Sequence, residues 1–198
     1  MNIFLAVVII AIWLYLLRVM RKSELHFWHF LWGSCGLFVI MMLFVRPFFT
    51  QPLAQIVAAI SGVFGEVSGM YTAYYKYGVI LVHSQVDSMS LVIDFECSGI
   101  LEIMAFLSLL LFFKAYRPWE KVLVGIVGTF YIVFANAVRI TVICAMIYFW
   151  GVPAYYAAHT FVGRILFYSL SVALYFVVFT RTQIMRQKVG GFTYGVAK

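Results

Sequence analysis

Three side chains that are suited to acyl-transfer chemistry stand in separate apolar stretches of the chain: the thiol of Cys97, the guanidinium of Arg139 and the imidazole of His159. Each lies 17 to 22 residues from a flanking basic residue, namely Lys114, Lys121 and Arg181 respectively. At a helical rise of ~1.5 Å per residue, these separations are roughly 25 to 33 Å. A bilayer's hydrocarbon core is about 30 Å thick. With the basic residues at one membrane surface, the three reactive groups are predicted to meet near the other surface, as in a membrane-embedded thiol enzyme.

Cys97 occurs in the run Glu96-Cys97-Ser98-Gly99, where strand-like sequence changes to an apolar helical segment. Ser98 can cap that helix, and the free N–H groups of a helix N-terminus lower the pKa of a nearby thiol. The carboxylates of Asp94 and Glu96 act in the opposite direction, because a nearby negative charge disfavours the thiolate. We therefore expect a candidate nucleophile here, and the alternative is a small apolar cysteine packed among helices.

Arg139 is costly where it stands, since an arginine deep in a spanning segment costs roughly 2.5–3.5 kcal/mol on insertion scales. Asn136 lies three residues earlier, on the same helix face, so the two present an amide and a cation together. One explanation is an ion pair with Glu102, which lies in the preceding apolar segment. The functional explanation is a fixed positive charge that stabilises the oxyanion formed when a thiolate attacks a carbonyl. The two explanations are compatible.

His159 precedes the last apolar segment, five residues before Arg164. An imidazole with an ordinary pKa near 6.5 exchanges protons at physiological pH, so His159 is the candidate acid and base. His83, in a β-branched run, is a reserve candidate for this role. His26 and His29 are interpreted as amphipathic packing at a membrane surface.

The composition defines the class of protein. The chain has 198 residues, 65% of them hydrophobic and 11% charged, with a mean hydropathy of +1.02. Soluble domains are nearer 45–50% apolar, so this is an integral membrane protein. The net charge of +7 is explained by basic residues that flank apolar segments rather than by nucleic-acid binding. Of the three cysteines, Cys35 and Cys144 are interpreted as packing residues; no metal or cofactor is expected, because no ligand spacing is found.

The apolar pattern predicts one all-α, polytopic membrane domain over residues 1–198. Five spans are expected, or six if the fourth one breaks near Arg139: 3–17, 27–45, 98–113, 122–150 and 160–180. The remaining segment, 46–96, is predicted to be extracytoplasmic. It includes an interfacial or re-entrant helix at 53–64, after a helix end at Pro47, and a β-hairpin between residues 78 and 95.

The basic residues predict the orientation. Ten of the fourteen fall on one side of the predicted topology: Arg18, Arg21, Lys22, Lys114, Arg117, Lys121, Arg181, Arg186, Lys188 and Lys198. Positively charged loops stay in the cytosol. This predicts a cell-membrane protein with its N-terminus outside, its C-terminus in the cytosol and its active site at the extracytoplasmic face.

Three short motifs carry a family resemblance: Cys97-Ser98-Gly99-Ile100, Asn136-Ala-Val-Arg139-Ile140 and His159 followed by Gly163. Their order and spacing resemble the exosortase and archaeosortase family of membrane transpeptidases, in particular the short G-type exosortases of Gram-positive bacteria. One departure is Glu102, where a small or uncharged residue is expected.

The resemblance implies a cysteine transpeptidase that cleaves the C-terminal sorting signal of a secreted, membrane-anchored protein. The new carboxyl end would then pass to an acceptor through a thioester. By the same resemblance, Cys97 is the nucleophile, Arg139 stabilises the transition state and His159 is the acid and base. The implied partners are the anchored substrate and membrane lipids.

Two other interpretations come from different classes of protein. The first is a scaffold or transporter subunit of an envelope polymer export system, in which Arg139, Glu102 and Arg164 form a buried charge network that fixes helix register. The second is a thiol redox protein, which is disfavoured because no resolving cysteine stands near Cys97.

Overall fold

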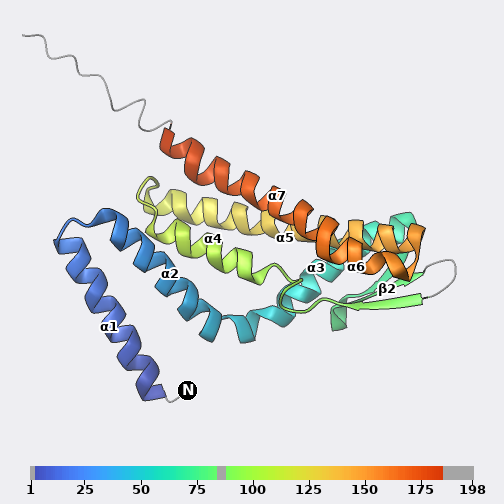
Figure 1. Cartoon of the computed structure of the whole chain (residues 1–198), viewed down its shortest axis with the longest axis horizontal. Coiled ribbons are helices and arrows are strands. Elements are labelled where there is room, and N and C mark those ends of the chain that lie inside the picture. The colour runs from blue at the N-terminus through green and yellow to red at the C-terminus, as the bar shows by residue number, and fades with distance from the viewer. Residues whose placement is uncertain (1–2, 84–87, 185–198) are drawn as a thin grey trace, which may run out of the picture.

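The computed structural model describes residues 3–83 and 88–184 (Figure 1). The α-helices are α1 (Ile3–Lys22), α2 (His26–Phe44), α3 (Arg46–Ser68), α4 (Ile100–Phe112), α5 (Pro118–Trp150), α6 (Tyr155–Ala157) and α7 (Gly163–Tyr175). Two 3-10 turns, η1 (Tyr75–Tyr77) and η2 (Val152–Ala154), and two π-helical segments, η3 (Ala158–Val162) and η4 (Phe176–Arg181), complete the helical part. The strands are β1 (Tyr71–Tyr74), β2 (Val79–His83) and β3 (Ser88–Val92). The predicted turn at 84–87 and the basic residues Arg186, Lys188 and Lys198 lie outside the described residues.

The helices are those of a multi-pass membrane protein. Among the described residues, four helical stretches are long and apolar enough to cross a bilayer: α2, α3, α5 and the continuous stretch Val152–Ile184. α1 forms a 20-residue helix over the first predicted span. α4 has only 13 residues, which is ~20 Å of helix and less than the ~30 Å hydrocarbon core.

The sequence left open whether residues 122–150 form one helix or two, and α5 decides between them. It is one continuous helix of 33 residues and does not break near Arg139. At ~1.5 Å per residue it is about 50 Å long, so it extends well beyond the thickness of the hydrocarbon core.

α3 corrects the prediction of a short interfacial helix at 53–64. It runs without a break for 23 residues and includes Pro52 in its interior. Pro47 was predicted to end a helix, and α2 does stop just before it, at Phe44. Pro47 also lies in the first turn of α3, where the missing N–H is not needed by the helix.

The last helix also differs from its prediction. The predicted span at 160–180 begins after His159, whereas the structure is helical from Val152 to Ile184. His159 therefore lies inside a helix, in the π-helical segment η3. Such single π turns occur inside α-helices and are frequent at functional sites.

The β structure is a three-stranded antiparallel sheet in the order β1-β2-β3. The sequence predicted two strands, and β1 was missed. β2 pairs with β3 from Val79↔Val92 to His83↔Ser88. In β1, the buried Tyr71 donates a hydrogen bond from its hydroxyl to the carbonyl oxygen of Ser61 in α3 at 2.6 Å, and its hydroxyl lies 3.0 Å from that of Thr141 in α5. These bonds join the sheet to the helices.

α4, α5 and α7 run along the length of the bundle, whereas α1 slants away from it (Figure 1). α4 packs against both α2 and α5, and α5 also packs against α7 and α3. One end of the bundle holds the α1–α2 turn, the α4–α5 loop and the end of the last helix. The other end holds the sheet, α3 and α6. The two ends are referred to below as the loop end and the sheet end.

Candidate active site

Cys97 lies in a tight turn between β3 and α4, and the turn is held by its own side chains. The Cys97 backbone N–H donates to Asp94 Oδ1 at 3.0 Å, and the Ser98 hydroxyl donates to the carbonyl oxygen of Phe95 at 3.0 Å. Ser98 Oγ accepts only a long bond of 3.4 Å from the N–H of Ile100, so its predicted capping role is weak. The buried thiol is thereby fixed just before the first turn of α4.

Gly99 and Asn136 lock this turn against α5. Gly99 has φ 78°, a left-handed conformation that favours glycine. A Cβ atom at Gly99 would make only an ordinary van der Waals contact, 3.4 Å from Asn136 Nδ2, so the backbone conformation and not the space favours glycine. The Asn136 amide donates a 2.6 Å hydrogen bond to the carbonyl oxygen of Cys97. Both residues therefore position the thiol.

The three predicted reactive groups meet at this turn. The distance from Cys97 Sγ to His159 Nε2 is 3.1 Å, and Arg139 Nη2 donates to the same sulfur at 3.9 Å. The three residues come from the β3–α4 turn, from α5 and from η3, so segments 42 and 62 residues away in sequence converge on one sulfur atom. A base within hydrogen-bond distance of a thiol, beside a fixed cation, is the geometry that nucleophilic catalysis requires.

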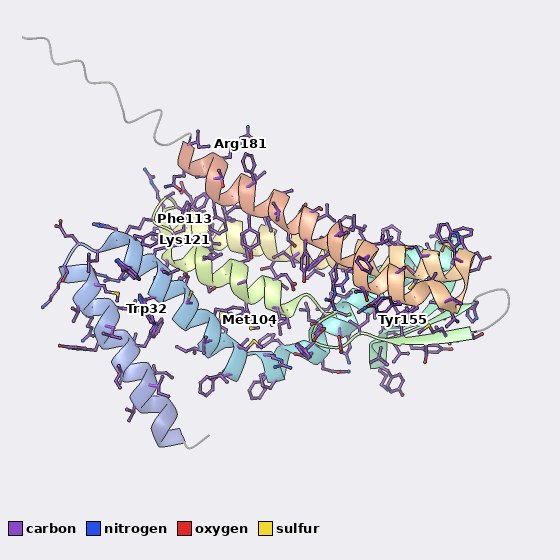
Figure 2. The ribbon with its side chains drawn as sticks, viewed as in Figure 1. Trp32, Met104, Phe113, Lys121, Tyr155 and Arg181 are labelled. Carbon is purple, nitrogen blue, oxygen red and sulfur yellow. The ribbon has the colours of Figure 1, made fainter. Side chains whose placement is uncertain are left out.

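His159 is oriented by its own helix. The ring of Tyr155, one turn earlier, stacks on the imidazole with ring centroids 5.4 Å apart and an angle of 27° between the planes. Figure 2 shows Tyr155 at the sheet end of the bundle. Sequence reasoning missed this residue, although an aromatic ring four positions before a histidine is a recognisable pair once the segment is known to be helical.

Arg139 is buried, with its guanidinium carbon 5.6 Å from the centre of the Phe167 ring. Among the described residues, three buried polar atoms close to this region lack a hydrogen-bond partner: Arg139 Nε, Asn136 Oδ1 and Glu102 Oε2. Buried polar atoms are nearly always paired. Donors and acceptors left free beside a thiol are available to bind the groups of a reacting peptide.

The predicted ion pair between Arg139 and Glu102 is not formed. Glu102 Oε2 is buried without a partner among the described residues, and Tyr175 reaches only the Glu102 backbone carbonyl, at 3.5 Å. Arg164 is exposed, so it also does not complete the predicted buried charge network. Residue spacing predicts the position of these charges along their helices but not the direction in which each helix turns its side chains.

The remaining sequence candidates lie elsewhere. His83, the reserve proton carrier, has its Nε2 atom 3.1 Å from the Thr72 hydroxyl on the sheet. Cys144 is fully buried in the core, as predicted, whereas Cys35 is exposed on α2. Asp94, which holds the Cys97 N–H, was considered in the sequence only for its charge.

Burial raises the pKa of the Cys97 thiol to about 11, although the Arg139 cation acts against this effect. Asp94 and Glu96 add to the increase. The sequence argument that a helix N-terminus lowers this pKa is therefore outweighed by desolvation. The resting thiol is protonated at neutral pH, so thiolate formation requires transfer of the proton to a base.

Because the Cys97 thiol is protonated at neutral pH, we expect it to be alkylated slowly there. Only the thiolate reacts. Its fraction rises steeply with pH below the pKa of about 11 and levels off above it. The iodoacetamide rate at the Cys97 peptide is therefore expected to increase about tenfold per unit between pH 7 and 10. Peptide mass spectrometry measures the rate, with a free cysteine derivative in the same buffer as the reference. A rate that is already maximal at pH 8 would instead indicate a preformed thiolate–imidazolium pair.

An apolar helix bundle with a thiol, an imidazole and a guanidinium in contact defines a class of membrane-embedded protein with a potential nucleophilic site. The family model described as transmembrane exosortase matches residues 1–177, and the chain belongs to this family. Membership implies a sortase-like membrane transpeptidase role at the level of the family. No curated protein and no solved structure matches the chain.

Proposed function

We propose that this exosortase is a cysteine transpeptidase that cleaves the C-terminal sorting signal of a secreted, membrane-anchored protein and transfers the new carboxyl end to an acceptor. The observation that carries the proposal is the contact of one sulfur with both a base and a cation, at 3.1 and 3.9 Å. A structural cysteine has no need of either neighbour. In the predicted orientation, the reaction takes place at the extracytoplasmic side of the cell membrane.

Acylation begins with proton transfer from Cys97 Sγ to His159 Nε2. The resulting thiolate attacks the carbonyl carbon of the scissile peptide bond, and a C–S bond forms. The carbonyl oxygen becomes negatively charged and is stabilised by the Arg139 guanidinium, whose Nε–H has no partner in the free protein among the described residues. Protonated His159 then donates its proton to the departing amine as the C–N bond breaks.

Deacylation reverses these roles. The thioester carbonyl on Cys97 is attacked by the amine of an acceptor, or by water, while His159 accepts the proton of the attacking group. The C–S bond breaks, the sulfur takes the proton back, and the substrate leaves with its new carboxyl linkage. Asn136 and Gly99 hold the turn in place during both halves of the reaction.

Trapping the thioester tests this proposal directly. The purified chain is incubated with a secreted protein that ends in an apolar segment and a basic tail, without an added amine acceptor. We expect a mass increase on the Cys97 peptide equal to the substrate's N-terminal fragment, and its release as a hydroxamate by hydroxylamine. Cys35 provides the control thiol and should stay unmodified. Cleavage that yields neither an adduct on Cys97 nor a hydroxamate of the N-terminal fragment when hydroxylamine is present would refute the covalent mechanism.

A further inference from the structure

A second polar cavity lies at the loop end of the bundle, away from Cys97. Its volume is about 460 Å³, and it lies where the α1–α2 turn meets the α4–α5 loop. Its polar lining consists of Arg21, Glu24, His26, His29, Lys114 and Lys121. Figure 2 places Lys121 at this end and Tyr155, the neighbour of His159, at the other. The cavity is therefore separate from the candidate active site.

The lining is strongly cationic. It combines one guanidinium, two ammonium groups and two imidazoles with a single carboxylate, that of Glu24. Lys121 is held in place, since its Nζ donates to the carbonyl oxygen of Leu111 at 2.5 Å. An excess of cations in a small cavity between helices favours an anion.

His29 gives independent evidence for a ligand. It was interpreted from the sequence as amphipathic packing, yet its side chain is only 8% exposed and lines the cavity. Its Nε2 atom is buried and has no hydrogen-bond partner among the described residues. The ring is held edge-on against Phe112, with centroids 5.7 Å apart. Native proteins rarely leave such an atom unpaired, so a bound group that pairs with it is expected.

An apolar groove adjoins this cavity. Its volume is about 800 Å³, and it runs between α2, the end of α4 and the last helix. The cavity and the groove share His26, Phe112 and Lys114, while side chains such as Phe30 and Phe176 line the apolar part. A charged cavity joined to an apolar groove fits an amphiphile with an anionic head and hydrocarbon chains.

We propose that this combined site binds an anionic membrane phospholipid of the phosphatidylglycerol type. The phosphate lies among Arg21, His29 and Lys114, and one acyl chain occupies the groove. Guanidinium and ammonium groups are the usual partners of phosphate. The Glu24 carboxylate accepts a hydrogen bond from a headgroup hydroxyl, while Arg21, Lys114 and Lys121 disfavour a headgroup that carries its own positive charge. The bound lipid joins the α1–α2 turn to the α4–α5 loop.

Native mass spectrometry and thermal unfolding of the full chain in detergent test the proposal. With added phosphatidylglycerol, we expect one retained lipid per chain and a higher melting temperature. Phosphatidylcholine and inorganic phosphate, at equal concentrations, should produce neither effect. Equal retention of phosphatidylcholine would overturn the headgroup assignment, and equal stabilisation by inorganic phosphate would indicate a simple anion site.

Variants locate the site. Arg21→Gln and Lys114→Gln should each weaken phosphatidylglycerol binding by about tenfold, as expected for loss of one charge-assisted contact. The matched control is Arg18→Gln, which removes an exposed charge one turn earlier on α1 that does not line the cavity. Equal weakening by all three variants would show that binding follows surface charge alone, and would reject the site. The wild-type lipid comparison remains decisive if a variant fails to fold.

Discussion

Replacing Cys97 with alanine is expected to abolish processing of an anchored substrate, with a loss on the order of 10⁴-fold or more. The variant retains the imidazole and the cation but has no atom that can form the acyl bond. Cys97→Ser should be almost as inactive, because an alcohol is far less ionised than a thiol beside the same base. Cleavage of a tagged substrate in membranes, followed by immunoblotting, measures the loss.

The serine variant also separates chemistry from folding. Serine has nearly the volume of cysteine, so the buried turn remains filled and the melting temperature should stay close to that of the wild type. Cys35→Ser is the matched control, since it changes an exposed thiol on α2. Normal processing by both Cys97 variants would leave the scaffold interpretation as the better one.

Replacing Arg139 with glutamine is expected to lower the cleavage rate by on the order of 10²–10³-fold, the usual cost of losing one oxyanion donor. Folding should not suffer in proportion. The side chain is buried, forms no ion pair with Glu102, and a buried arginine in a spanning helix costs roughly 2.5–3.5 kcal/mol. Activity should therefore fall while the melting temperature holds or rises.

The variant Arg139→Lys also tests whether the guanidinium stabilises the oxyanion. A lysine keeps the charge but cannot reproduce the planar, forked donor geometry of a guanidinium, so we expect an intermediate rate. Arg18→Gln, an exposed arginine in α1, is the control for loss of positive charge. A purely structural Arg139 would give the opposite pattern, with a lower melting temperature and a normal rate per folded molecule.

Much of the site could be predicted from spacing alone. The distances in sequence from Cys97, Arg139 and His159 to their basic flanks predict a similar depth for all three, and the structure brings Arg139 and His159 within 3.9 Å of the Cys97 sulfur. The apolar runs also predicted the positions of most helices. Position along a helix can be predicted well, because it depends on the number of residues and on the helical rise.

The rotation of each helix about its own axis is harder to predict from the sequence. The absence of a Glu102–Arg139 pair, the π turn that contains His159 and the stacking of Tyr155 all depend on how neighbouring helices pack. The full length of α3 was missed because Pro47 was interpreted as a helix end and only the apolar part, 53–64, was assigned to a helix. Pro47 is compatible with a first turn, and Pro52 is tolerated inside the helix. The hydrogen bond from the Cys97 N–H to Asp94 was not predicted, because it depends on the conformation of the turn.

The shortness of α4 has a consequence for the choice of scissile bond. Cys97 comes just before a helix that is ~20 Å long, which is shorter than a ~30 Å hydrocarbon layer. If the loop end of α4 lies at one membrane surface, as the basic residues predict, the sulfur is expected below the opposite surface. Only the part of the substrate backbone that lies close to its apolar membrane anchor reaches that depth. Under the proposed function, we therefore expect the protein to select the scissile bond by its distance in sequence from the substrate's membrane anchor. The side chains next to the bond contribute as well.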